Sequence, residues 1–275
     1  MGEGRGEGVC GSESEVVFAR VFNSFRDSTR TLLLRMGPRA LLCVYSCPFV
    51  VQWYLLMVER TQGLILRTRL LTETSLIVQW LTPDAGRIAT VAKGARRPNS
   101  PFRGKLDLFY LADFSFARSR RSDLHTLREV VLRETHSPLR QELGYLQQAS
   151  YCATLIEQTT ETETPLPAVF NLVNDLLNHL PTRPPQPATT LTFEIKLLAE
   201  LGLQPDLSKS KLTPGAKRIV SALATDDWPT VSRLKLSEAQ VTELGQFLHG
   251  FLIFHLGKIP KGRILYGHQS SRTTR

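Results

Sequence analysis

Between residues 58 and 136, apolar residues gather in short runs in which they often alternate with polar ones. Runs of strand length, rich in Val, Ile and Phe and separated by polar turns, lie at residues 61–68, 76–81, 87–92, 106–116 and 124–134. The segment TPDAG at residues 82–86 has Pro and Gly where a turn needs them. Five short strands in one stretch predict a small closed β-barrel of the OB type.

After Pro138 the apolar residues recur at helical spacing. Helices are predicted over residues 139–156, 165–180, 189–201, 214–223 and 237–256, with a short one at 230–234. Ser237 and Gln240 have the spacing of a capping box, and Gly257 is placed to end the last helix. The pattern therefore predicts an α+β chain with several domains, in which an N-terminal OB-fold barrel precedes an all-α domain.

The predicted domain boundaries are residues 57–136 for the OB-fold domain and 137–260 for the helical domain, with a basic flexible tail at 261–275. Residues 1–56 differ from the rest, with a low-complexity start and an uncharged apolar run at residues 40–57. We interpret Met57 as the true start of translation. The alternatives are a membrane anchor or signal using residues 40–56, although Pro48 interrupts that run, and a folded extension.

Composition is that of a globular protein, with 21% charged residues and a formal net charge of +9. Such a charge favours nucleic acid, an acidic protein or an anionic membrane surface as partner. Three of the four cysteines precede Met57, which leaves Cys152 alone in the rest, and the sequence contains no CxxC pair. Neither a disulfide framework nor a zinc ribbon is predicted, and a cytoplasmic location is expected.

The charge is concentrated around residues 93–106, which read KGARRPNSPFRGKL. Two prolines and two glycines exclude a continuous helix or a central strand there, so this segment is predicted to be a loop. Eight basic residues face only two acidic ones between residues 93 and 121. A loop with such an excess suits the phosphate backbone of a nucleic acid, whereas the plainer alternative is a solvated basic surface without a partner.

The candidate nucleic-acid contacts are basic residues of the barrel and of this loop, with a second cluster just after the fourth strand. They are Arg87, Lys93, Arg96, Arg97, Arg103 and Lys105, and then Arg118, Arg120 and Arg121. Phe102 is a candidate for stacking on a base, but packing in the core is the favoured role for the aromatic residues here.

No sequence pattern points to an enzyme. The six histidines lack the spacing of metal ligands, and no nucleophile-elbow, phosphate-loop or kinase signature occurs. We therefore expect neither a catalytic site nor a cofactor nor a bound metal.

The ordered segments QGLILRTR, TPDAGRIATVAKGARRPNSPFRGKL, LHTLRE and SYCATLIEQ resemble the RecO family of bacterial recombination mediators. The resemblance extends over about residues 62–257 and is most specific at residues 86–104. It implies a protein that binds single- and double-stranded DNA, anneals complementary strands and, with RecR, helps to load RecA onto DNA coated by single-strand binding protein. It also implies a DNA repair role in the nucleoid.

The resemblance further implies a groove in the helical domain for the acidic tail of single-strand binding protein, beside which Lys196, Lys217 and Arg218 are available cations. Many family members carry a four-cysteine zinc module just after the segment that here reads LGLQPDL, at residues 201–207. Here residues 208–215 read SKSKLTPG, without a cysteine, so zinc is not expected. Two other functions remain open: an OB-fold RNA-binding protein, and a membrane-anchored protein.

Overall fold

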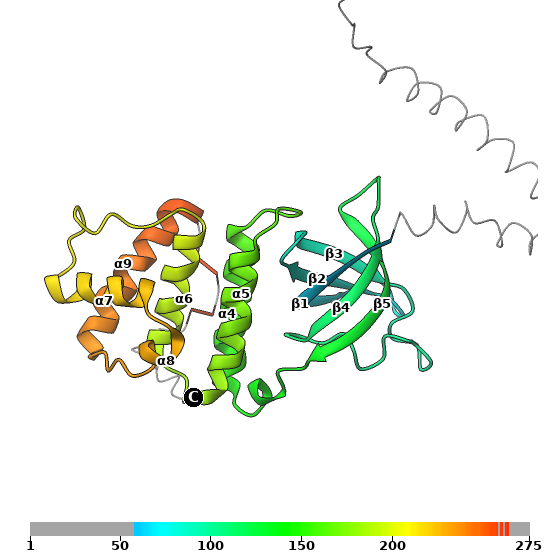
Figure 1. The fold of residues 1–275 in the computed structure, drawn as a ribbon, viewed down its shortest axis with the longest axis horizontal. Helices are drawn as coiled ribbons and strands as arrows, with labels where there is room; N and C mark the ends of the chain where they lie inside the picture. The colour runs from blue at the N-terminus through cyan, green and yellow to red at the C-terminus, as the bar shows by residue number, and fades with distance from the viewer. Residues whose placement is uncertain (1–57, 258, 261, 264–275) are drawn as a thin grey trace, which may run out of the picture. The chain divides into compact units, whose positions relative to one another are not determined.

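A computed structural model describes residues 58–257, 259–260 and 262–263 (Figure 1). The interpretations of Met57 as the start and of residues 40–56 as an anchor lie outside the described residues, as does most of the predicted tail. The strands are β1 (Val58–Leu70), β2 (Leu76–Thr82), β3 (Gly86–Ala92), β4 (Leu111–Ala117) and β5 (Leu124–Glu134). They close into a barrel in the order β1-β2-β3-β5-β4.

The barrel interior is filled by one set of alternating side chains from each strand. In β2, Val78 and Trp80 are fully buried, while Gln79 between them lies on the other face. The Trp80 indole N–H donates to Thr90 Oγ1 at 2.8 Å, and its ring stacks on Phe114 with centroids 4.0 Å apart. The partner of the buried indole N–H is therefore built into the barrel, as burial of a polar group requires.

Strand register decides which connections meet at each end of the barrel. Leu70 pairs with Leu76, which in turn pairs with Ala92, so the turn at residues 71–75 and the connection at 93–110 leave from one end. Val58 pairs with Ala117 at the other end, from which the turns at 83–85 and 118–123 leave. β3 and β5 are parallel neighbours, and the remaining strand pairs are antiparallel.

The helical region follows directly. Its elements are η1 (Ser137–Arg140), α4 (Leu143–Thr159), α5 (Pro167–His179), η2 (Leu180–Thr182), α6 (Pro187–Glu200), α7 (Pro214–Thr225), α8 (Trp228–Val231) and α9 (Glu238–Leu256). Their apolar faces form one core that also includes Leu64, Leu66, Leu81 and Phe109 from the barrel region. Helices thus cover part of the outer surface of β1 and β2. This explains why residues 64–66 are all apolar: Ile65 faces the barrel interior, while Leu64 and Leu66 pack against the helices.

The segment between α4 and α5 also connects the helices to the barrel. The Glu163 amide donates to the Arg87 carbonyl at 2.9 Å. Gly86 has a φ of +64°, and a Cβ atom there would lie only 1.8 Å from the Thr164 carbonyl oxygen. Glycine is required at this position by both its backbone conformation and the close approach. On the same side, Arg67 forms an ion pair with Glu157 at 2.7 Å.

The predicted architecture, an OB-type barrel followed by helices, is confirmed. The capping box of α9 is present, and Gly257 ends that helix at a φ of +70°. The fourth strand was predicted too early, since β4 begins at Leu111 rather than at residue 106. Phe109 adopts a φ of +62°, outside the range of regular strands, and its carbonyl accepts a hydrogen bond from His136 Nδ1 at 2.7 Å.

The first predicted helix is also divided. The short 3-10 turn η1 contains Pro138, at which the helix was predicted to open, and α4 begins only at Leu143. Among the described residues, no helix combines the length and the apolar character needed to cross a membrane.

Candidate nucleic-acid interface

Residues 93–105, which we term the basic loop, connect β3 to β4 and fold as a series of tight turns. Amides three residues ahead donate to the carbonyls of Gly94, Arg97, Ser100 and Phe102 at 3.0–3.2 Å. Gly94 and Gly104 have φ values of +67° and +72°, which favour glycine near the two ends of the loop. The loop predicted from its prolines and glycines is therefore an ordered run of turns rather than an extended chain.

Phe102 anchors the basic loop to the barrel. Its ring is 7% exposed and belongs to the barrel core together with Ala95, Trp80 and Ile65. A loop residue thus contributes to the core at the end of the barrel from which the loop leaves. Phe102 thus packs in the core, the role favoured for it from the sequence. To stack on a base, its ring would have to leave this core.

The anchored loop presents four cations to solvent: Lys93, Arg96, Arg97 and Arg103. The Arg96 guanidinium donates to the Glu73 carbonyl at 3.0 Å, and that of Arg103 donates to the Pro98 carbonyl at 3.3 Å. Within the described part of the chain, none of the four is paired with a carboxylate. Their charge is therefore available to an external anion.

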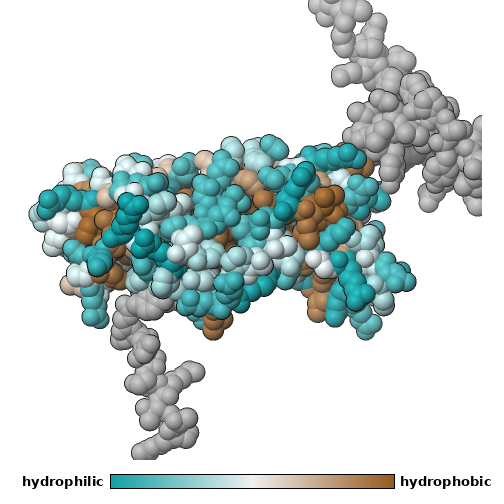
Figure 2. All heavy atoms as spheres, turned by 60° about the horizontal axis from the view of Figure 1, so that its bottom comes forward, coloured by the Kyte–Doolittle hydropathy of each residue, from teal (hydrophilic) through white to brown (hydrophobic). Residues whose placement is uncertain are grey.

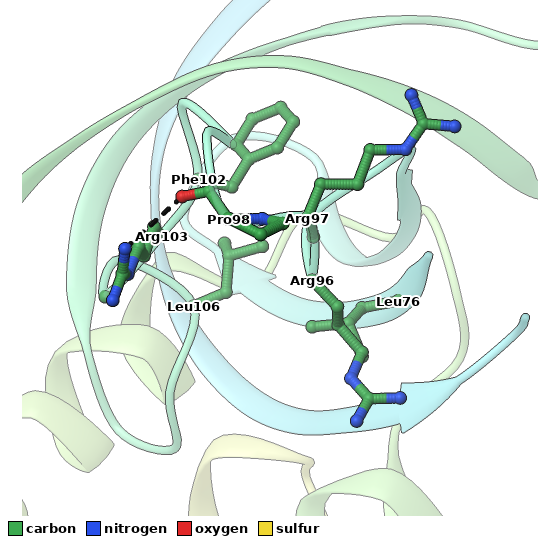
Figure 3. Close-up of a pocket in the computed structure, with 9 residues that line it drawn as sticks. Leu76, Arg96, Arg97, Pro98, Phe102, Arg103 and Leu106 are labelled. Atoms are coloured by element: carbon green, nitrogen blue, oxygen red, sulfur yellow. Dashed lines mark hydrogen bonds between the residues drawn. The ribbon is translucent and has the colours of Figure 1, made fainter. Parts of the chain in front are cut away.

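A pocket of about 420 Å³ is lined by three of these cations, Arg96, Arg97 and Arg103, and we term it the mouth pocket. Its apolar part is made by Leu76, Pro98, Phe102 and Leu106. Figure 3 shows the side chains of Arg96, Arg97 and Arg103 spreading in three directions around this apolar centre. The arrangement can bind a ligand that combines negative charge with an apolar surface.

Two of the predicted contacts are occupied within the protein. Lys105 lies in the basic loop, but its ammonium donates to the Val130 carbonyl at 3.1 Å. Arg87 points to the helical region, where its guanidinium donates to Thr160 Oγ1 at 2.7 Å and to the Thr160 carbonyl. Burial at this contact lowers the pKa of Arg87. Arg87 thus connects β3 to the end of α4.

The second predicted cluster lies at the opposite end of the barrel, in the turn between β4 and β5. Arg118 donates to Glu59 at 2.6 Å and to Glu163 at 2.7 Å. The hydrogen bond to Arg118 lowers the pKa of the Glu59 carboxyl and raises the pKa of Arg118 itself. Arg120 and Arg121 are exposed in the same turn.

Three cations were predicted beside a groove for an acidic protein tail. One of them, Lys196, has a partner inside the helical region. Its ammonium donates to the Ala224 carbonyl near the end of α7 at 3.1 Å, and burial lowers its pKa. Lys217 is half-buried and Arg218 exposed on α7. Among the described residues, no group of three or more His, Cys, Asp or Glu side chains is arranged to hold a metal ion.

Sequence reasoning missed the apolar residues beside the basic loop. Figure 2 shows one face of the molecule, on which apolar patches interrupt a largely hydrophilic surface. The large exposed apolar side chains of the described part are Leu70, Leu71, Val131, Leu143, Ile253 and Phe254. Leu70 is the last residue of β1, and Leu71 begins the turn whose Glu73 carbonyl accepts from Arg96. The signal was a pair of leucines directly before the polar sequence TETS, at the end of a strand.

The fold and the site together place the chain in one class of protein. In this class, an OB-type barrel with a basic connection between its strands precedes a helical region. Two family profiles match the chain: "Recombination protein O N terminal" at residues 57–136 and "Recombination protein O C terminal" at residues 140–211. Together they cover more than half of the chain, and the chain belongs to the RecO family.

Relatives named "DNA repair protein RecO" agree with this assignment. The protein of Bacillus subtilis (strain 168) is 30% identical over 152 residues, which cover 55% of this chain and 59% of the relative. Those of Alkaliphilus metalliredigens and Exiguobacterium sibiricum are 31% and 29% identical, over 61% and 60% of their lengths. The matched stretch thus spans about three fifths of each relative.

Proposed function

We propose that this protein is a mediator of DNA repair and homologous recombination. It binds single- and double-stranded DNA through the barrel domain at residues 57–136 and anneals complementary strands. With RecR, it helps RecA to replace single-strand binding protein on DNA. In this proposal it works in the cytoplasm at the nucleoid, without a catalytic step or a cofactor.

The observation that carries the proposal is the set of four exposed cations on the basic loop, for which the described part of the chain provides no carboxylate partner. Cations that replace the condensed counterions of DNA gain affinity without reading sequence. When the cations contact the phosphates of two single strands, they also lower the repulsion between those strands as they approach each other. Family membership and the names of the relatives support a role in DNA repair.

Within the helical region, Lys217 and Arg218 are the more available of the predicted cations for an acidic protein tail, because Lys196 already serves the end of α7. We assign the groove for single-strand binding protein to this region as part of the same proposal. Exposed cations beside an apolar bundle suit a short peptide that carries both carboxylates and apolar side chains.

Annealing of two complementary oligonucleotides, labelled as a fluorescence donor and acceptor pair, tests the proposal. The purified protein should accelerate pairing, and the acceleration should fall steeply between 50 and 200 mM salt, as expected for phosphate contacts. A competitor RNA of the same sequence should displace DNA less well than competitor DNA does. No acceleration at low salt would overturn the annealing function, and stronger competition by RNA would favour an RNA-binding protein instead.

A further inference from the structure

Leu70 is the cross-strand partner of Leu76, one of the apolar residues that line the mouth pocket. It is the last residue of β1, and its side chain is 66% exposed. Directly paired residues of antiparallel strands place their side chains on the same face, about 4.5–5.5 Å apart at Cβ. Since Leu76 lines the mouth pocket, Leu70 lies on the pocket side of the strand pair.

The turn that directly follows Leu70 is connected to the basic loop by hydrogen bonds. The Arg96 amide donates to the Thr74 carbonyl at 3.0 Å, and the Arg96 side chain donates to the Glu73 carbonyl at 3.0 Å. The turn itself is closed by the Leu71 amide, which donates to the Ser75 carbonyl at 3.0 Å. These hydrogen bonds hold Arg96 of the basic loop against the turn that directly follows Leu70.

A large exposed leucine beside three guanidinium groups indicates the chemistry of the ligand. Inorganic phosphate would use the cations and leave the leucine in water. A duplex would do the same, because its bases are stacked and paired with their faces covered. An unpaired nucleotide offers both a phosphate for the cations and an apolar ring face for the leucine, and ring faces are what proteins cover when they bind single strands.

We propose that Leu70 and the mouth pocket form a binding site for an unpaired nucleobase, flanked by phosphates held on Arg96, Arg97 and Arg103. The protein would accordingly favour single-stranded DNA, or the single-stranded side of a junction, over blunt duplex. This inference rests on the proposed binding of DNA and adds to it the state of the strand that is recognised.

The test compares Leu70→Ser with Leu143→Ser in the full-length protein. Leu143 is the matched control, because it is 68% exposed at the start of α4, outside the barrel. Affinities for a single-stranded oligonucleotide and for a blunt duplex of equal length are measured by fluorescence anisotropy. Leu70→Ser should weaken single-strand binding by about five- to tenfold, towards the low end of base-stacking contributions, and change duplex binding less than about twofold.

A second readout follows the base itself. In an oligonucleotide carrying 2-aminopurine, binding of the unmodified protein should change the fluorescence of that base, and Leu70→Ser should abolish the change. Leu70→Met, which keeps an apolar side chain, should retain both the signal and the affinity, as should Leu143→Ser.

Equal losses for single strand and duplex, or no loss with Leu70→Ser, would overturn the nucleobase site while leaving DNA binding intact. An unmodified protein that binds neither substrate at low salt would overturn the proposed function as well. Unchanged DNA affinity together with lost binding to an acidic peptide would assign Leu70 to a protein partner and equally overturn the nucleobase site.

Discussion

Replacement of Arg96, Arg97 and Arg103 together by alanine tests whether the basic loop contacts DNA phosphates. All three side chains are exposed, and among the described residues Arg96 and Arg103 donate to the backbone carbonyls of Glu73 and Pro98. Two exposed hydrogen bonds limit the loss of folding free energy to roughly 1–2 kcal/mol. Phe102, which anchors the loop, is untouched. The variant should therefore be folded, with its loop in place and three charges fewer.

The magnitude follows from counterion release. Each phosphate contact contributes about 0.9 to the slope of log affinity against log salt for duplex DNA, and about 0.7 for single strands. Loss of three contacts should flatten the slope by roughly two to three units. Over a fourfold rise in salt, the affinity of the variant should consequently fall roughly 20- to 40-fold less than that of the unmodified protein.

The assay is a salt titration of oligonucleotide binding by fluorescence anisotropy, on several unrelated sequences. Because phosphate contacts carry no sequence information, every sequence should lose affinity about equally, and annealing should slow in parallel. The charge-matched control replaces Lys211, Arg233 and Lys235, which are exposed outside the barrel. It removes the same net charge and should leave the slope almost unchanged.

A folded loop variant that keeps its affinity and slope would show that the basic loop is only a solvated surface. A control variant that flattens the slope as much as the loop variant does would be equally damaging. It would mean that the net charge of the protein, and not this loop, determines the salt dependence.

Two further predictions concern stability. Phe102→Ala should lower the free energy of unfolding by about 3 kcal/mol, measured with urea, and should weaken DNA binding because the loop loses its anchor, while Phe102→Leu should do less of both. Arg263→Ala should cost about 3–5 kcal/mol, because it leaves the fully buried Glu194 carboxylate without its ion pair at 2.6 Å. Adding Glu194→Leu to Arg263→Ala should recover most of that loss, and no recovery would contradict the explanation by an uncompensated charge.

Much of the fold could be predicted because local pattern and tertiary environment agree. The strands of the barrel alternate between a filled interior and an outer face, and the polar turns between them carry their own signals. The capping box at Ser237 is a local motif that needs no tertiary contact to form. Such elements are determined within a few residues of sequence, and these were predicted with the right type and nearly the right bounds.

The error at residues 106–110 arose because an aromatic-rich run has the composition of a strand. Phe109 instead turns the chain in a left-handed conformation, and its carbonyl pairs with the His136 ring 27 residues later. A distant partner compensates a locally unfavourable conformation here, and nothing in the neighbouring sequence indicates that partner.

The internal partners of two predicted DNA contacts likewise lie far away in the sequence. Arg87 and Arg118 looked like the loop arginines in sequence, but Thr160 and Glu163 from the segment after α4 reach them in the fold. Leu70 was overlooked because a leucine at the end of a strand is usually assumed to be buried, whereas this one is exposed. Exposure and pairing are properties of the folded chain, whereas charge is visible in the sequence.

The buried ion pair in the helical region also bears on the order in which the protein can be made. Arg263 reaches back 69 residues to bond Glu194, and it also donates to the Gly245 carbonyl in α9. A ribosome adding about 5–20 residues per second exposes Glu194 some 3–14 s before Arg263. The Tyr151 hydroxyl, which donates to the same carboxylate, is its earlier partner. The buried carboxylate of the helical core therefore gains its ion-pair partner only when one of the last described residues has been made.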